Sequence, residues 1–375
     1  MLKAWLACLG LCLPALAMRT AGGEADRGEG VPAAFTYRNP LDFSYSYFSG
    51  SAEETKKEIR DPCIVREGDT YYLVFTMWPF RGRDEKHLND VDMGSSPGIR
   101  LFSTKDFKTW KTEGWLVKSS ELPNDCPYKH RFWAPEIHKD GGKFYLIFTA
   151  DNWVDPKYNQ DGRWGMYAYI GVAGKITGPY EHITRIPSGP CDTSLFHDTD
   201  GTFYAVMPKG DICIQKLDLS ELPKGVIKRV GEERRIVSCS NNDIGMKSSP
   251  EYLEGPWMEK LNGKYIVFFA ALYGRNNLPE DRGYWVGAAS GDSAMGPFKK
   301  DPRGKVFHGG HVAGFDGPDG RKWFSYRWEK DAKFRGLLCI DPLDVDKDGR
   351  IQADCTAGAE IRVPVRQPAG GNDPR

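Results

Sequence analysis

Apolar and polar residues follow one another along most of the chain in short runs that predict β-strands joined by tight turns. Five segments, beginning at residues 63, 137, 193, 255 and 312, each contain an apolar run, a polar turn and an aromatic-rich run. The first reads CIVREGDTYYLVFT and the second IHKDGGKFYLIFTA. Each of these patterns is typical of a strand–turn–strand hairpin. No stretch of useful length has the 3.6-residue period of a helix, so the sequence predicts an all-β protein.

The hairpins recur at a regular spacing. One aromatic residue opens the second strand of each hairpin, and the five are Tyr72, Tyr145, Tyr204, Tyr265 and Trp323. Their positions differ by 73, 59, 61 and 58 residues. A period near sixty with one such hairpin per repeat predicts a β-propeller built of four-stranded blades around an axis. The sequence therefore predicts five blades and a central active-site pocket.

Three acids lie at the beginning of predicted hairpins, in the local sequences RDP, DTS and LEGP. They are Asp61, Asp192 and Glu254, and we interpret them as occupying the same position of three different repeats. The first strand of a blade lies nearest the axis, so the three side chains are expected to meet in the central pocket. Asp42 is a weaker rival of Asp61, and Glu251 is the main rival of Glu254.

The two ends of the chain differ in composition from the predicted propeller. Residues 1–17 resemble a secretory signal peptide, with Lys3, an apolar core and an Ala-Leu-Ala cleavage pattern. The apolar core is too short to span a membrane. Residues 18–34 are predicted to be a flexible leader, residues 35–365 a single catalytic domain and residues 366–375 a polar tail. We therefore expect a secreted or periplasmic protein without a membrane span.

The composition of the chain argues against two classes of function, nucleic-acid binding and a thiolate zinc site. The chain has 51 basic and 51 acidic residues and a pI of about 7.0, which gives no basic surface for nucleic acid. No C-x-x-C pair is present, so a thiolate zinc site is not predicted. Aromatic residues make up 13% of the chain, which suits both packed β-sheets and surfaces that stack on sugars. The pattern does not define an oligomeric state.

Five short motifs occur in order along the chain: RDP at 60–62, WAPE at 133–136, DTSLF at 192–196, EGP at 254–256 and GH at 310–311. This ordered set resembles glycoside hydrolase family 43, and the likeness extends over roughly residues 38–345. The resemblance implies a five-bladed propeller. It also implies an inverting enzyme that acts largely on arabinose- and xylose-containing polysaccharides.

By the same resemblance, Asp61 is the general base, Glu254 the general acid, and Asp192 the residue that tunes and orients the acid. His311 corresponds to a histidine near the pocket floor that in some members helps to hold a hydrated ion, here Ca²⁺ or Na⁺. No protein-ligated metal and no required cofactor are implied. The chain departs from the family's pattern at Thr193, where proline is usual, and after His311, where a second glycine is usual.

Four further residues are candidates for substrate binding, together with His311. Trp133 and Trp257 are candidates for stacking on sugar rings, and a place in the core is the alternative for each. Arg60 and Arg327 are candidates for contacts with substrate hydroxyls or a carboxylate. An ordinary salt bridge is the alternative for each arginine.

The sequence thus predicts a secreted inverting glycoside hydrolase that cleaves α-L-arabinofuranosidic or β-D-xylosidic bonds in plant-type polysaccharides or oligosaccharides. Hydrolysis of galactan or another glycan, or sugar binding without catalysis, are the alternatives. A retaining fructan- or sucrose-type hydrolase fits less well, because the chain lacks the Asn-Asp-Pro-Asn and Glu-Cys motifs of that class. An exo mode is expected because either the polar insert at 81–98 or the segment from Asn152 to Trp164 could close one end of the pocket.

Overall fold

The structure is a computed structural model. It describes residues 34–49, 52–77, 96–155, 157–158, 166–274, 276–277, 282–328, 336–346, 349–352, 358 and 360–364. The predicted signal peptide and polar tail lie outside the described residues, as do nearly all of the leader and most of the insert at 81–98. The described residues all belong to the compact unit that begins at Ala33.

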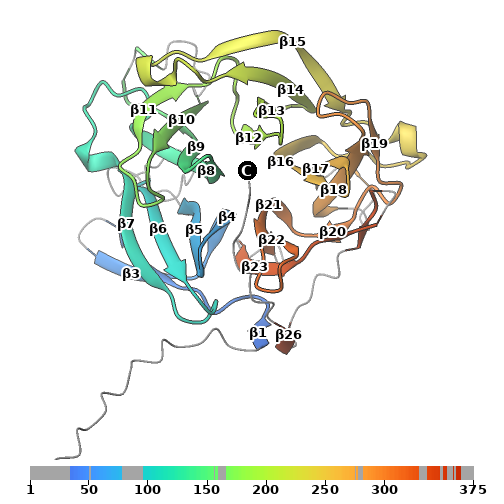
Figure 1. The fold of residues 1–375 in the computed structure, drawn as a ribbon, viewed down its shortest axis with the longest axis horizontal. Coiled ribbons are helices and arrows are strands. Elements are labelled where there is room, and N and C mark those ends of the chain that lie inside the picture. Colours follow the sequence, from blue (N-terminus) through green and yellow to red (C-terminus); the bar gives the residue numbers. More distant parts are fainter. Residues whose placement is uncertain are drawn as a thin grey trace, which may run out of the picture. The chain divides into compact units, whose positions relative to one another are not determined.

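Five antiparallel sheets form the blades of a β-propeller and surround a common centre (Figure 1). Blade 1 contains β4 (Ile59–Glu67), β5 (Thr70–Met77), β6 (Gly98–Thr104) and β7 (Lys111–Lys118). Blade 2 contains β8 (His130–Asp140), β9 (Lys143–Asp151), β10 (Tyr167–Ala173) and β11 (Glu181–Arg185). Blade 3 contains β12 (Ser194–His197), β13 (Phe203–Lys209), β14 (Asp211–Asp218) and β15 (Lys228–Val237).

Blade 4 contains β16 (Tyr252–Leu261), β17 (Lys264–Tyr273), β18 (Gly283–Gly291), β19 (Phe298–Lys300) and β20 (Phe307–His308). Blade 5 contains β21 (Gly310–Asp316), β22 (Lys322–Trp328) and β23 (Leu337–Pro342). Figure 1 shows the first strand of each blade, namely β4, β8, β12, β16 and β21, next to the centre. The prediction of an all-β, five-bladed propeller is confirmed.

The aromatic residue that opens each second strand pairs with the innermost strand of its own blade. Tyr72 lies opposite Val65 in blade 1, and Trp323 lies opposite Phe315 in blade 5. Because side chains alternate between the two faces of a strand, these rings enter the layers between neighbouring blades. The predicted hairpins are therefore the first two strands of the blades.

Apolar residues from several blades form a continuous core around the centre. It includes Cys63, Ile137, Trp257 and Val312 from four innermost strands, all buried. The helices in the described part of the chain are single 3-10 turns at Ser119–Glu121, Leu222–Lys224 and Asn242–Ile244. No helix among the described residues is long and apolar enough to cross a membrane.

The N-terminal segment completes blade 5. The N–H of Leu41 donates to the carbonyl of Leu338 at 2.8 Å, and Asn39 Nδ2 donates to the carbonyl of Ile340 at 2.7 Å. Asn39 Nδ2 also lies 3.0 Å from Oδ2 of the fully buried Asp341. Residues 39–41 thus lie beside β23 as a fourth strand would, and they join the beginning of the propeller to its end.

Three small antiparallel pairs in the described part of the chain lie outside the blades. They are β1 (Ala34–Arg38) with β26 (Glu360–Pro364), β2 (Tyr45–Ser49) with β3 (Ala52–Lys56), and β24 (Asp344–Val345) with β25 (Ile351–Gln352). The first pair again brings residues from the two ends of the described chain together.

Candidate active site

A residue with a left-handed backbone lies near the beginning of each innermost strand, and β8 has a second one at Arg131. The φ angles are 52° at Asp61, 44° at Ala134, 59° at Asp192, 49° at Gly255 and 52° at His311. In blades 1, 2, 4 and 5 the pairing with the second strand shifts register at this residue, as in a β-bulge. A left-handed backbone costs an L-residue about 1–2 kcal/mol, so the surrounding structure must hold each of these turns in place.

Glu254 does not share the register of the other two acids. It comes one residue before its bulge, whereas Asp61 and Asp192 are themselves the left-handed residues. The left-handed residue of blade 4 is Gly255, where a Cβ atom would lie 2.7 Å from Nδ1 of His311. Only glycine allows His311 to approach this closely, and the acid of blade 4 accordingly stands at the preceding position.

Asp61 is buried and both of its carboxylate oxygens have partners. Thr76 Oγ1 donates to Oδ2 at 2.7 Å, and His311 Nδ1 lies 3.1 Å from Oδ1. Burial alone would raise the pKa of Asp61. The charge and hydrogen bond of His311, helped by the charges of Arg327 and Arg60, outweigh burial and hold this pKa well below its usual range. Asp61 is therefore an ionised acceptor.

His311 is the cationic partner of Asp61 and is only 4% exposed. Burial lowers its pKa, but the charge of Asp61 and the hydrogen bond to it, followed by the charges of Asp192 and Glu136, raise the pKa to about 9. The imidazole is thus charged at neutral pH, and Asp61 and His311 form a buried ion pair.

Asp192 has the opposite shift. Burial, and next the negative charges of Glu254 and Asp61, raise its pKa to about 7 against the opposing effect of His311. Its backbone N–H donates to Thr149 Oγ1 at 3.0 Å, and the thiol of Cys191 lies 3.3 Å from its Oδ1. The site therefore contains one carboxyl that is firmly ionised and another that retains a proton near neutral pH.

Glu254 accepts a hydrogen bond from a tyrosine of the same blade. The hydroxyl of Tyr284, in β18, lies 2.6 Å from Oε1 of Glu254. Burial and then the charge of Glu254 raise the pKa of Tyr284 well above its usual value, so the hydroxyl keeps its proton and acts as a donor. The guanidinium of Arg327 lies 4.4 Å from the centre of the Tyr284 ring. A Cβ atom at Gly310 would lie within 1.7 Å of this ring, so the glycine makes room for it.

The arginines and Trp133 lie around these acids. The guanidinium of Arg60 lies 5.6 Å from the centre of the Trp133 ring, and Trp133 is half-buried. The charges of Arg60 and Arg327 both act on Asp61. The structure thus brings both arginines and Trp133 to the site at which the sequence predicts them.

Trp257 occupies a different environment from the expected sugar-facing one. It is 6% exposed, its indole N–H donates to Glu259 Oε1 at 2.9 Å, and its ring stacks on His138 at 5.0 Å. It lies three residues beyond Glu254 along β16, inside the apolar core. Trp257 therefore has a packing role, which is the alternative that its sequence context leaves open.

Sequence analysis missed Thr76, Thr149 and Tyr284. The two threonines had a detectable signal, because each ends a closely similar phrase, YLVFT at 72–76 and YLIFT at 145–149. Thr76 Oγ1 accepts from the backbone N–H of Ala134 at 2.6 Å, just as Thr149 accepts from Asp192. Each therefore links the second strand of one blade to the left-handed residue of the next blade. Tyr284 lies in no recognisable motif.

Nδ1 of His311 lies 3.1 Å from Asp61 Oδ1, so this ring nitrogen already has a partner. Among the described residues, no group of three or more His, Cys, Asp or Glu side chains is arranged to hold a metal ion. A hydrated Ca²⁺ or Na⁺ next to His311 stays a prediction from the sequence.

The chain matches known proteins along most of its length. The sequence model of "Glycosyl hydrolases family 43" matches residues 55–351. A xylosidase/arabinosidase of Humicola insolens is 27% identical over 221 residues, which are 56% of this chain and 35% of that protein. A β-D-galactofuranosidase of Aspergillus niger is 27% identical over 287 residues, 70% of this chain and 75% of that protein.

One solved structure extends the likeness to the fold. A GH43 protein from Bacillus licheniformis superposes with a TM-score of 0.61 at 20% identity, covering 90% of this chain and 60% of that one. The chain spans only about a third of the length of the Humicola relative. At 20% sequence identity, this superposition shows that the two chains share the propeller fold.

Proposed function

The chain belongs to glycosyl hydrolase family 43, and on this premise we propose that it hydrolyses glycosidic bonds with inversion at the anomeric carbon. Asp61 is the proposed general base and Glu254 the proposed general acid. Asp192 is the proposed residue that keeps a proton available beside the acid.

The opposite protonation of neighbouring carboxyls supports this proposal. The pKa of Asp61 is held well below its usual range, whereas that of Asp192 is raised to about 7. Glycoside hydrolysis needs an ionised base and an available proton at the same time. Asp61 supplies the ionised carboxyl, and Asp192, whose pKa is moved in the opposite direction, supplies a carboxyl that holds a proton close to Glu254.

The residues act in a concerted displacement. Asp61 accepts a proton from a water molecule whose oxygen attacks the anomeric carbon, and the bond from that carbon to the leaving oxygen breaks. Glu254 gives a proton to the leaving oxygen, so that it departs as an alcohol. Tyr284 holds the carboxyl of Glu254 through Oε1, and His311 and Thr76 hold Asp61 in a fixed orientation as the charge moves.

We propose α-L-arabinofuranosides or β-D-xylosides as substrates, in agreement with the sequence-based expectation and with the name of the Humicola relative. β-D-Galactofuranosides are a second candidate, because the Aspergillus relative named for that sugar matches over most of both chains. Secretion is also proposed, on the evidence of residues 1–17 alone.

A panel of aryl glycosides tests the proposal. It should contain α-L-arabinofuranoside, β-D-xyloside, β-D-galactofuranoside and β-D-galactoside, each assayed with the wild type and with Asp61→Asn. We expect hydrolysis of one sugar by the wild type and its near-complete loss in the variant, which should still fold but melt at a lower temperature because its ion pair with His311 is gone. A folded Asp61→Asn protein with full activity would refute the role of Asp61.

A further inference from the structure

A fourth carboxyl lies buried on the innermost strand of blade 2, and the proposed reaction gives it no role. It belongs to Glu136, the last residue of the WAPE motif, which lies two residues beyond the left-handed Ala134 in β8. Glu136 is only 4% exposed. A buried carboxylate is costly unless its oxygens accept hydrogen bonds, so the contacts of Glu136 indicate which part of the molecule it holds in place.

One oxygen of Glu136 contacts two side chains. Ser194 Oγ donates to Oε2 at 2.8 Å, and Nε2 of His138 lies 2.8 Å from the same oxygen. Ser194 is fully buried and begins β12, so this hydrogen bond joins the innermost strands of blades 2 and 3. A hydrogen bond to a carboxylate is roughly twice as strong as one between neutral groups, and the bond is therefore a strong tie between the two blades.

The same bond fixes the turn that contains Asp192. The backbone of Asp192 is left-handed, with φ at 59°, and such a conformation persists only where the surrounding structure holds it. Blade 2 supplies two contacts that do so. Thr149 Oγ1, in β9, lies 3.0 Å from the N–H of Asp192, and Glu136, in β8, accepts from Ser194 two residues further along. The position of Asp192 thus depends on blade 2.

His138, the other partner of Glu136, extends the contacts to blade 4. Its ring stacks on that of Trp257, with an interplanar angle of 18° and 5.0 Å between the ring centres. The indole N–H of Trp257 donates in turn to Glu259 Oε1 at 2.9 Å. The orientation of His138 is therefore fixed, and His138 keeps the Glu136 carboxylate directed at Ser194.

The charge of Glu136 also acts on groups at the centre of the propeller. Burial lowers the pKa of His311, and Glu136 follows Asp61 and Asp192 among the charges that raise it. Burial and then the charge of Glu136 raise the pKa of the Cys63 thiol well above its usual range. A substitution of Glu136 therefore alters the charge near the site as well as a hydrogen bond, whereas a substitution of its hydroxyl partner alters the hydrogen bond alone.

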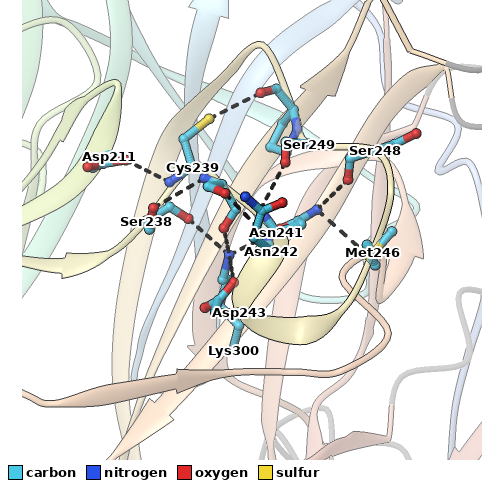
Figure 2. Close-up of polar contacts among 12 residues, drawn as sticks. Asp211, Ser238, Cys239, Asn241, Asn242, Asp243, Met246, Ser248, Ser249 and Lys300 are labelled. Carbon is cyan, nitrogen blue, oxygen red and sulfur yellow. Dashed lines mark hydrogen bonds and ion pairs between the residues drawn. The ribbon is translucent and has the colours of Figure 1, made fainter.

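A buried charge elsewhere in the fold offers a comparison. Lys300, in β19, is 6% exposed, and its Nζ donates to the carbonyl of Ser238 at 3.2 Å and to Asn241 Oδ1 at 3.1 Å (Figure 2). It also pairs with Asp243 Oδ1 at 2.7 Å. This cluster fixes the connection between blades 3 and 4 and contains none of the three proposed catalytic acids. Its loss should therefore affect stability alone.

We propose that Glu136 is a positioning residue, which acts through Ser194 to hold Asp192 beside the proposed acid. This inference rests on the proposed function, because the position of Asp192 matters only if its carboxyl takes part in the reaction. Without the bond from Ser194, the strained turn is held at one point fewer and the carboxyl of Asp192 shifts. A small displacement of this kind slows the chemical step, whereas the residues that bind the sugar stay in place.

Ser194→Ala is the main variant, because it removes the hydroxyl and leaves the charge of Glu136. Ser103→Ala is the matched control. Ser103 is also buried, and its Oγ donates to a carboxylate oxygen, Oε1 of Glu113, at 2.6 Å, but this pair joins β6 to β7, the two outer strands of blade 1. Asp243→Asn is a second control, which removes a carboxylate from the cluster around the buried lysine. We would measure kcat and KM with the aryl glycoside that responds in the panel, and the melting temperature of each variant.

For Ser194→Ala we expect kcat to fall roughly tenfold while KM stays within about twofold of the wild-type value. In an Asp192→Asn background the same substitution should lower kcat by less than about twofold, because the group through which it acts is already gone. It should also cost less than about twofold in a Glu136→Met background, which lacks the acceptor. Both controls should at most lower the melting temperature and leave kcat unchanged.

Two kinds of result would overturn the positioning role while leaving the proposed function intact. One is an unchanged kcat for Ser194→Ala, and the other is an equal loss in the wild-type, Asp192→Asn and Glu136→Met backgrounds, as a merely structural role would give. A wild type that hydrolyses none of the aryl glycosides would instead contradict the proposed function, and with it the role of Asp192 on which the inference rests.

Discussion

The ion pair between His311 and Asp61 leads to a prediction about pH. His311→Asn removes the positive charge while keeping an N–H donor near the place of Nδ1. Asparagine is also among the residues that best tolerate the left-handed backbone found at this position, where φ is 52°. The substitution therefore tests the charge more than the geometry.

The magnitude follows from the distance between the two charges. At 3.1 Å and an effective dielectric constant of ~20, their attraction is about 5 kcal/mol, equivalent to nearly four pKa units. The charges of Arg60 and Arg327 and the hydrogen bond from Thr76 remain in the variant. We therefore expect the pKa of Asp61 to rise by roughly two units or more, because burial is then opposed less strongly.

The sign of the effect on activity is fixed by the role of Asp61. A general base works in its ionised form, so kcat/KM is lost as pH falls through the pKa of Asp61. The acid limb of the variant should lie at higher pH than that of the wild type. The assay is kcat/KM from about pH 3 to pH 8 with the sugar that responds in the panel. His197→Asn, at a half-buried histidine of β12, is the control and should not move the limb.

Stability gives a second measurement of the same pair. The lowered pKa of Asp61 stabilises the fold above pH ~3.8, an effect lost as pH falls through the folded-state value. The raised pKa of His311 stabilises it fully below pH ~6.5, an effect lost as pH rises through about 9. The difference in unfolding free energy between the wild type and His311→Asn should therefore be largest between pH ~3.8 and pH ~6.5. An acid limb and a stability profile identical to those of the wild type would refute the ion pair.

Three further predictions concern other parts of the fold. Because the pKa of Asp192 is raised to about 7, kcat/KM of the wild type should fall as pH rises through neutrality, and kcat/KM of Asp192→Asn should show no such fall near pH 7. Gly255→Ala should lower kcat/KM by roughly tenfold or more by displacing His311, whereas Gly263→Ala, also left-handed but facing open space, should cost only about 1–2 kcal/mol of stability. Asn39→Ala should lower the free energy of unfolding in urea by about 2–4 kcal/mol without changing kcat/KM, since it removes the buried bonds that close the propeller.

The blades could be predicted from the sequence because each hairpin is defined locally. Turn residues and alternating apolar positions lie within some fifteen residues of one another, and Tyr72 and Trp323 mark equivalent strands 251 positions apart. The convergence of acids on the centre follows from this repetition alone. For the same reason Thr76 and Thr149 could have been found, since they end repeated phrases.

Other features depend on contacts between blades, which no local pattern encodes. The bulge moves Glu254 one residue away from the register of Asp61, because Gly255 must admit a histidine from blade 5. Tyr284 reaches Glu254 from β18, which follows β16 only after a full hairpin. The burial of Trp257 depends on His138 from blade 2.

The central claim is that Glu254 protonates the leaving group while Asp61 activates water. The most direct test is the leaving-group dependence of Glu254→Gln and Asp61→Asn. With an oligosaccharide, Glu254→Gln should lose ~10²–10⁴-fold in kcat/KM, and with a 2,4-dinitrophenyl glycoside it should keep most of its activity, because that leaving group departs without a proton. Asp61→Asn should lose activity with both. Equal losses of Glu254→Gln on the two substrates, or an active Asp61→Asn, would contradict the account.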